Sequence, residues 1–222
     1  MLLAIDTSTQ KIGLALYDGV QVRHEAVWPS PNHHTVELSP AIQSALDGAG
    51  LTVDDLQAVC VATGPGSYTG LRIGMAAAKG LALACSLPIV GVPTFDVLVA
   101  AQTPQDMALA AVLEAGRGRL AVGWYESKNG AWKQKKDAEV LTPQEFSKRI
   151  RQPTLICGEL SEDVRRLLGR KRVNVTLASP AESFRRPGYL AELGWQRWQA
   201  GEVDDPYTLA PTYLHAGEAI PA

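Results

Sequence analysis

The chain has 222 residues, 46% of them hydrophobic, and a formal net charge of −2 at pH 7. This length and apolar content allow a full core, in one large domain or in two small ones. Asp6 follows too soon for a secretory signal, and the apolar run 70–87 carries Arg72 and Lys79 and is too rich in glycine and alanine to enter lipid well. We therefore expect a cytoplasmic protein with no membrane span.

The cysteines point to the same compartment. Cys60, Cys85 and Cys157 are odd in number, lie in apolar segments and show no C-x-x-C spacing. This pattern is typical of small buried side chains in a reducing environment.

The first half of the chain predicts antiparallel strands followed by alternating helices and strands. Asp18-Gly19 is a hairpin turn between alternating apolar and polar segments. Pro40 leaves two starts open for the first helix, near Ser39 or near Thr35 with a bend. In chain order the expected elements are strands 2–6, 12–17 and 20–27, a helix over 35–49, strand 58–62, a helix over 70–87, strand 89–92, and a helix from 94 to about 102.

The second half predicts a smaller α/β unit. Thr142, Pro143 and Glu145 form a helix-start pattern, with Thr142 as N-cap and Glu145 completing a capping box. The other expected elements are strands 108–114, 120–125 and 154–158, and helices 161–168 and 187–200. We expect a βββαβαβ domain over 1–103 and a smaller, degenerate domain over 104–222, whose helix 187–200 could pack back on the first.

The organising feature is the stretch 63–74, TGPGSYTGLRIG. Gly64 and Gly66 flank a proline and permit a sharp turn, and Ser67 or Thr69 can cap the helix that follows. One face of that helix carries small residues, which either admit a helix of another chain or are covered within the same domain. If the face meets a partner, we expect Gly74→Leu to abolish association while the isolated chain stays folded.

Two segments could bind phosphate. Asp6, Thr7, Ser8 and Thr9 end the first strand opposite Gly64 and Gly66, and such a turn can hold phosphate or is simply a hydroxyl-stabilised turn. The second half holds the basic excess, densest over 165–172. There we favour a solvated helix end over a phosphate contact, because the whole chain is not basic.

Several enzyme motifs are missing from the sequence. There is no Gly-Lys-Ser/Thr of a P-loop, the glycine spacing is one residue too long for a dinucleotide fingerprint, and Ser67 lacks the flanks of a nucleophile elbow. His33 and His34 are adjacent, and neither has a histidine four residues on. His33 with Glu37 is better explained as a solvated pair than as a metal site.

Four segments of the sequence resemble those of a known protein family. The segments AIDTS (4–8), His34-Thr35, GPGSYTGLRIG (64–74) and AKGLA (78–82) are similar to those of the TsaB family, formerly called YeaZ, of tRNA threonylcarbamoyladenosine biosynthesis. The resemblance covers the first hundred residues closely. It implies the superfold of actin, Hsp70 and sugar kinases, built of two RNase H-like α/β halves, the second small and degenerate.

The resemblance also implies a role. The catalytic paralogue TsaD holds a metal with an H-x-x-x-H pair on its first helix, whereas here Leu38 stands four residues after His34. We expect a non-catalytic pseudoenzyme without metal or cofactor of its own, and nucleotide binding no tighter than weak, with ATP and metal held by the partner subunits. It would form a heterodimer with TsaD, joined by the ATPase TsaE, for threonylcarbamoyl transfer to the adenosine beside the tRNA anticodon.

The pairing is expected to use the helices at 35–49 and 70–86. The residues assigned to it are Leu38, Ile42, Gly70, Leu71, Gly74, Ala77, Ala78 and Leu81. The isolated chain could form a homodimer, and tRNA would be met through the complex. The alternative is a stand-alone enzyme of the superfold, either a small-molecule kinase or a glycoprotease-like peptidase.

Overall fold

The computed structural model describes residues 1–31, 33–171 and 173–214. The chain forms two compact units, and their boundary differs from the expected one. The first unit contains Met1–Val97 and also Arg186–Thr212, and the second contains Leu98–Arg185 with Tyr213 and Leu214. The division expected at 103/104 is therefore corrected, because the chain returns to its first unit after leaving the second.

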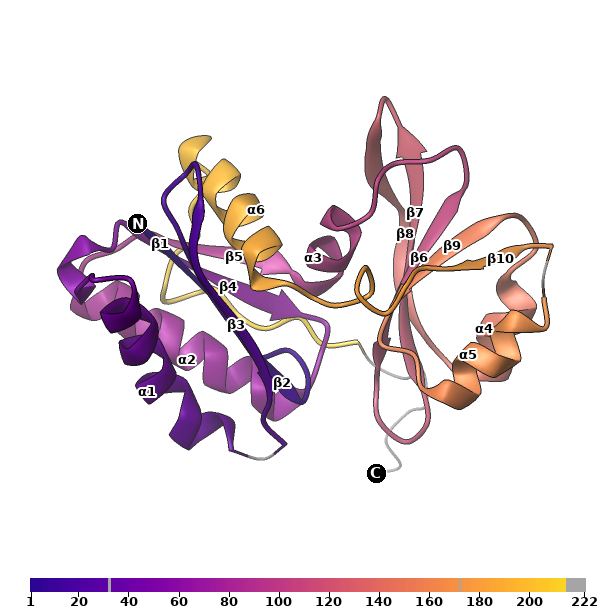
Figure 1. Ribbon diagram of the computed structural model, residues 1–222, viewed down its shortest axis with the longest axis horizontal. Helices are drawn as coiled ribbons and strands as arrows, with labels where there is room; N and C mark the ends of the chain where they lie inside the picture. Colours follow the sequence, from indigo (N-terminus) through magenta and orange to yellow (C-terminus); the bar gives the residue numbers. More distant parts are fainter. Residues whose placement is uncertain (32, 172, 215–222) are drawn as a thin grey trace. The chain divides into compact units, whose positions relative to one another are not determined.

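The first unit is built on a five-stranded mixed sheet of order β3-β2-β1-β4-β5 (Figure 1). The first three strands are antiparallel neighbours, and β4 and β5 extend the sheet in parallel with β1. The strands are β1 (Leu2–Asp6), β2 (Lys11–Tyr17), β3 (Val22–Pro29), β4 (Ala58–Gly64) and β5 (Ile89–Pro93). All residues of β1 and β4 are buried, which explains their near-continuous apolar sequences.

Helices cover both faces of this sheet. On one face α1 (His34–Gly48) and α2 (Tyr68–Ala84) lie side by side over a core that includes Leu3, Ile5 and Val59. On the other face α6 (Pro187–Gln199) packs Leu190 and Ala191 against Leu2, Ala4 and Cys60. A short 3₁₀ helix (Val53–Asp55) and α3 (Thr94–Ala100) complete the elements up to residue 100.

The approach of α6 is close and specific. A Cβ at Gly194 would lie 2.4 Å from the Cys60 sulfur, so only glycine fits where the helix crosses β4. The Trp195 and Tyr17 rings meet edge to face with centroids 5.6 Å apart. The helix 187–200, whose position the sequence left open, is therefore a layer of the first unit.

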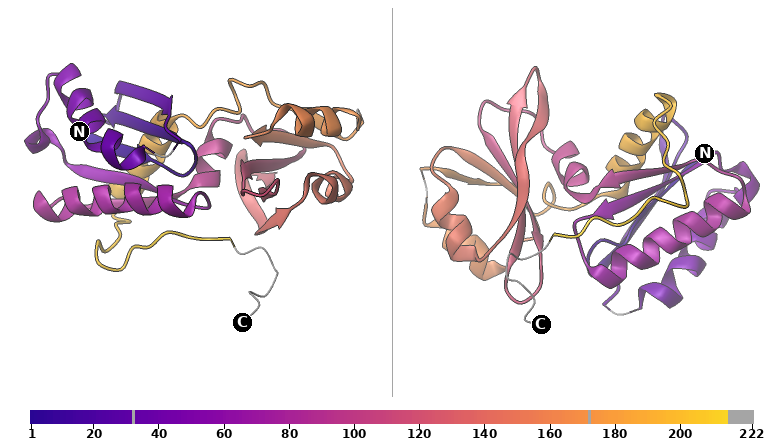
Figure 2. Two further views of the ribbon diagram at one scale, coloured as in Figure 1. Left: turned by 90° about the horizontal axis from the view of Figure 1, so that it is seen from below. Right: turned by 180° about the vertical axis from the view of Figure 1, so that it is seen from behind.

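The second unit repeats the strand order of the first, as β10-β9-β6-β7-β8. Its strands are β6 (Ala108–Glu114), β7 (Leu120–Lys128), β8 (Ala131–Leu141), β9 (Thr154–Gly158) and β10 (Val175–Leu177). The short helices α4 (Pro143–Arg149) and α5 (Glu162–Gly169) lie on one face of this sheet (Figure 1, Figure 2), over a core that contains Phe146 and Leu168. The unit is a reduced copy of the first, with two short helices and a three-residue last strand.

Hydrogen bonds settle one local prediction for the second unit. Thr142 caps α4, and its hydroxyl accepts a hydrogen bond from the Glu145 amide while the Glu145 carboxylate accepts one from the Thr142 amide, which confirms the capping box. The strands β8 and β10 were not predicted. Much of β8 is polar and exposed, so its sequence lacks the apolar alternation of a half-buried strand.

Candidate functional site

The glycine turn between β4 and α2 packs directly against the turn that follows β1. Gly64 has φ +114, a left-handed conformation that glycine adopts readily. The Ser67 amide donates to the Ser8 carbonyl at 2.6 Å, and a Cβ at Gly66 would lie 2.2 Å from that same oxygen. Ser67, rather than Thr69, is the N-cap of α2, since its hydroxyl accepts from the Gly70 amide at 3.3 Å.

The residues predicted to bind phosphate are brought together, and several of their polar groups hydrogen-bond within the first unit. The Thr7 hydroxyl donates to the Gly70 carbonyl at 2.7 Å, and the Ser8 amide donates to Asp6 Oδ1 at 2.8 Å. The Ser8 hydroxyl lies 2.9 Å from that of Thr94, which also accepts from the Gly64 amide. Asp6, Thr7 and Ser8 are all buried. In this conformation the polar groups are engaged by the fold, and of the two interpretations the hydroxyl-stabilised turn accounts for them.

The small-residue face of α2 turns toward its own sheet. A Cβ at Gly70 would lie 2.2 Å from the Thr7 carbonyl oxygen, and a Cβ at Gly74 would lie 2.2 Å from the Thr7 hydroxyl oxygen. Six of the eight residues assigned to partner contact are buried inside the first unit: Leu38, Ile42, Gly70, Leu71, Gly74 and Ala78. Their assignment is corrected, because helical periodicity had identified the inner face. Ala77 and Leu81 are half-buried at its edge.

The opposite side of the same two helices is exposed and weakly polar. On α2 it carries Ala76, Gly80 and Leu83, and on α1 it carries Val36, Pro40 and Ser44, which we call the outward surface. These six residues are uncharged, and the exposed charged residues Arg72 of α2 and Asp47 of α1 flank them. Val36 is 67% exposed and Leu83 47%, and a Cβ at Gly80 would meet nothing within 4 Å. In the sequence, residues 76, 80 and 83 share one helical face. The small residues at 70, 74 and 78 share another, and the spacing alone does not show which face is exposed.

His34 has a structural role in the first unit. His34 is buried, with its Nε2 3.0 Å from the Thr9 carbonyl oxygen, and Leu38 lies in the core. Glu37 accepts a hydrogen bond from the Trp28 indole at 2.8 Å, which lowers the pKa of that carboxyl. Within residues 1–31, 33–171 and 173–214, no three His, Cys, Asp or Glu side chains converge as a metal site would require.

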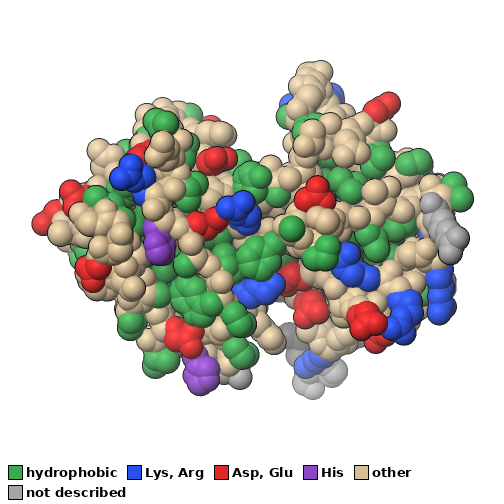
Figure 3. All heavy atoms as spheres, viewed as in Figure 1, with side chains coloured by type: hydrophobic (Ala, Val, Ile, Leu, Met, Phe, Trp, Pro, Cys, Tyr) green, Lys and Arg blue, Asp and Glu red, His purple; other side chains and the backbone are tan. Residues whose placement is uncertain are grey.

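The basic cluster at 165–172 is divided among local contacts. Arg166 pairs with Glu162 at 2.6 Å, Arg165 donates to the Ala178 carbonyl at 3.4 Å, and Lys171 donates to the Ser147 carbonyl. In Figure 3, Lys and Arg side chains lie among Asp and Glu over the α4 and α5 region instead of forming a cationic patch. Arg172 lies outside the described residues. These contacts support the solvated helix end.

The repeated sheet order and the glycine turn define the class of protein. The chain has the two-unit α/β fold of the actin and sugar-kinase superfold. A ROK hexokinase from Thermus thermophilus superposes with a TM-score of 0.50 at 11% identity, covering 90% of this chain and 99% of that one, a likeness of fold alone. None of the helices in the described part of the chain is long and apolar enough to cross a membrane.

Comparisons of sequence narrow the class to one family. The family model described as TsaD, tRNA N6-adenosine threonylcarbamoyltransferase, matches residues 27–155. The tRNA threonylcarbamoyladenosine biosynthesis protein TsaB of Bacillus subtilis is 34% identical over 98% of this chain and 95% of its own length. The structure of YeaZ from Pseudomonas aeruginosa has a TM-score of 0.75 at 25% identity, covering 95% of this chain and 99% of that one. The chain belongs to the TsaB family.

Proposed function

We propose that this chain is a non-catalytic, activating subunit in tRNA threonylcarbamoyladenosine biosynthesis, and that it pairs with a TsaD-type catalytic subunit. The observation that carries the proposal is the outward surface of α1 and α2. It is exposed, uncharged and made of small or apolar side chains, on a chain that belongs to the TsaB family. A surface of this kind is costly to leave in water over a large area and suits a helical partner.

The geometry of the two helices supports a bundle-like contact. α1 and α2 lie side by side on one sheet face, so their outward sides can meet two helices of a partner at once. Ala76 and Gly80 have almost no side chain, which lets a facing helix come close, while Val36 and Leu83 can insert into its grooves. The proposal thus keeps the two helices named from the sequence and moves the contact to their other side.

The remaining parts of the reaction are proposed for the partners. The TsaD-type subunit would hold the metal and transfer the threonylcarbamoyl group to the adenosine beside the anticodon, and the ATPase TsaE would join the pair. This chain has Leu38 where the catalytic relatives carry a second histidine, and its own Thr7 and Ser8 hydroxyls are engaged internally. Its contribution would be to hold the catalytic subunit in an active conformation.

The test is co-elution of the chain with a TsaD-type subunit. We expect Ala76→Asp and Val36→Asp each to weaken association at least tenfold, because a charge would be buried against an apolar partner. Gln196→Asp, an exposed position on α6 at the opposite sheet face, is the control and should pair normally. All three variants should keep their melting temperatures within a few degrees. Pairing that survives both outward-surface substitutions would contradict the proposal.

The same substitutions address self-association. If two copies of the chain use the outward surface when no partner is present, Ala76→Asp should convert a dimer to a monomer in sedimentation experiments. A dimer that persists in this variant must use another surface.

A further inference from the structure

The second unit contains a cavity that pairing with a catalytic subunit does not explain. Its volume is about 400 Å³, within the usual range of small-molecule sites. It opens where the middle parts of β7 and β8 meet the segment between α4 and β9. Among its lining side chains are Trp124, Lys135, Lys136, Arg149, Arg151 and Thr154. Four of the nine lining residues are cationic, although the chain as a whole carries a net charge of −2.

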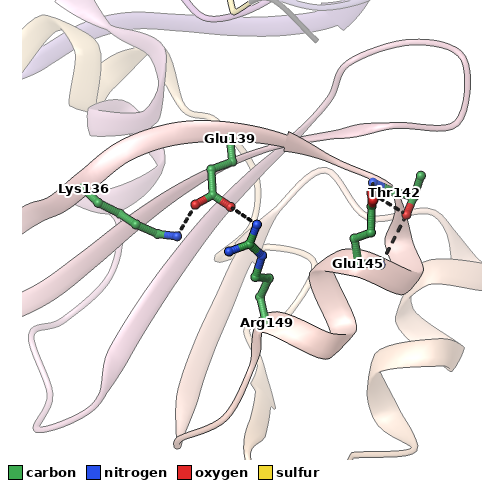
Figure 4. Close-up of polar contacts among 5 residues, drawn as sticks. All are labelled: Lys136, Glu139, Thr142, Glu145 and Arg149. Carbon is green, nitrogen blue, oxygen red and sulfur yellow. Dashed lines mark hydrogen bonds and ion pairs between the residues drawn. The ribbon is translucent and has the colours of Figure 1, made fainter. Parts of the chain in front are cut away.

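The nearby carboxylates neutralise these cations only in part. Lys136 and Arg149 share a single carboxylate, Glu139, which lies between them in Figure 4. Arg149 is 3.8 Å from Glu139 Oε2, too far for a hydrogen bond. Lys135 lies 3.6 Å from Glu126, and both of those side chains are about half exposed, where an ion pair is weak. The wall of the cavity therefore remains positive.

Figure 4 shows how these groups are arranged. Glu139 projects from β8 toward Lys136 on the same strand and toward Arg149 at the end of α4, and the start of α4 is fixed by the Thr142–Glu145 capping box. Two cations from different elements thus lie on one side of the cavity.

Trp124 lines the cavity, although its indole Nε1 is not itself accessible from it. Trp124 is 9% exposed, and its indole Nε1 is buried with no hydrogen-bond partner. A buried N–H group without an acceptor is rare in proteins and costly. The Lys136 ammonium lies 5.0 Å from the centre of the same indole ring. Two carboxylates, Glu139 and Glu126, lie beside the cavity, and Glu139 Oε2 is buried without a hydrogen-bond partner. The four cationic lining residues outnumber them and are all hydrogen-bond donors, which suits an acceptor-rich anion.

We propose that this cavity binds a nucleoside monophosphate group, either as a free nucleotide or as one residue of a single-stranded RNA. Arg149, Arg151 and Lys136 would contact the phosphate, because arginine and lysine donors match its oxygens. Inorganic phosphate alone would leave most of a cavity of about 400 Å³ empty, whereas a ribose and base would fill it against Trp124. The proposal does not depend on the pairing surface, which lies in the first unit.

The test titrates the full chain with AMP. Binding is monitored through the indole N–H signals in proton–nitrogen NMR spectra. Trp124→Phe identifies the Trp124 signal among those of the five tryptophans. We expect AMP to shift that signal in a saturable way and inorganic phosphate to bind at least tenfold more weakly. A six-nucleotide RNA without secondary structure distinguishes the two sources. Tighter binding of the RNA than of AMP assigns the site to RNA, and the reverse assigns it to a free nucleotide.

A matched pair of double variants tests the contacts. Arg149→Gln with Arg151→Gln should weaken binding of the preferred probe at least tenfold and reduce the salt dependence of its affinity. Lys133→Gln with Lys148→Gln removes the same charge from exposed positions that do not line the cavity, and should change the affinity less than threefold. The proposal is overturned if neither AMP nor RNA saturates at millimolar concentration, if phosphate binds as tightly as AMP, or if both double variants weaken binding equally.

Discussion

The hydroxyl oxygen of Thr7 lies where the Cβ of any residue larger than glycine at position 74 would be. A Cβ on Gly74 would lie 2.2 Å from Thr7 Oγ1, and that oxygen is held in place by its hydrogen bond to the Gly70 carbonyl at 2.7 Å. The turn after β1 and the first turns of α2 are thereby locked together. The small residues of α2 serve the packing of their own domain.

Gly74→Ala should therefore destabilise the isolated chain. We expect a loss of about 1–3 kcal/mol from overpacking against Thr7, only partly offset by the better helix propensity of alanine. Gly80→Ala is the matched control on the same helix. Nothing lies within 4 Å of its Cβ, so it should stabilise the chain by up to about 1 kcal/mol. Urea denaturation of both variants measures the difference, and equal stabilities would show that α2 is not locked as described.

This replaces the expectation from sequence that Gly74→Leu would leave the isolated chain folded. Leucine is larger than alanine, so it should unfold or strongly destabilise the first unit.

The cysteines should differ in reactivity. Burial raises the pKa of Cys157 to about 12 and raises the pKa of Cys60 as well, so both stay protonated at pH 8. Cys85, at the end of α2, is half-buried. Thiol titration with a chromogenic disulfide should give about one fast thiol per native chain and all three in guanidinium. Loss of the fast thiol in Cys85→Ser is the control, and two fast thiols in the native chain would contradict the burial.

The capping box of α4 should make stability depend on pH. Hydrogen bonds from the Thr142 amide and then its hydroxyl lower the pKa of Glu145 below its unfolded value. The stabilisation is therefore complete above about pH 4.3 and is lost as pH falls through the lower folded pKa. Wild type should melt above Glu145→Gln at pH 7, and the gap should narrow toward pH 3. A difference in melting temperature that widens toward pH 3 would contradict a stabilising role for the ionised Glu145.

Glu25 on β3 hydrogen-bonds to the start of the segment 186–212, which belongs to the first unit. Its Oε1 accepts from the Gly188 amide at 2.8 Å and its Oε2 accepts from Arg186. Glu25→Ala should cost about 1–2 kcal/mol in urea denaturation, since it leaves the amide near the start of α6 without its acceptor. Glu25→Gln keeps an acceptor and should cost less, because an ion pair to the exposed Arg186 side chain contributes little. Equal losses of stability in Glu25→Ala and Glu25→Gln would show that the stabilisation comes from the charge of Glu25.

Local chemistry made much of the fold predictable. Asp18-Gly19, the Thr142–Glu145 box and the buried runs of β1 and β4 each determine their element from a few adjacent residues, and the structure contains all of them. The strand β8 was missed because most of its residues are exposed and polar. The return of α6 was left open because a contact such as Gly194 with Cys60 joins residues far apart in the sequence.

The site was harder to predict for a related reason. Both sides of α2 carry small or apolar residues, so periodicity alone cannot say which side faces the sheet. That choice depends on Thr7, which crowds Gly70 and Gly74 but not Gly80. The cavity of the second unit likewise gathers Trp124, Arg149 and Thr154 from separate elements.

Threonylcarbamoyl transfer to tRNA, measured with a purified TsaD-type subunit, tests the proposed role most directly. The chain alone should show no turnover, and its addition should raise the rate of the catalytic subunit at least tenfold. Ala76→Asp should lose this stimulation while remaining folded, and Gln196→Asp should keep it. Turnover by the chain alone, or full stimulation by folded Ala76→Asp, would contradict an activating subunit that works through the outward surface of α1 and α2.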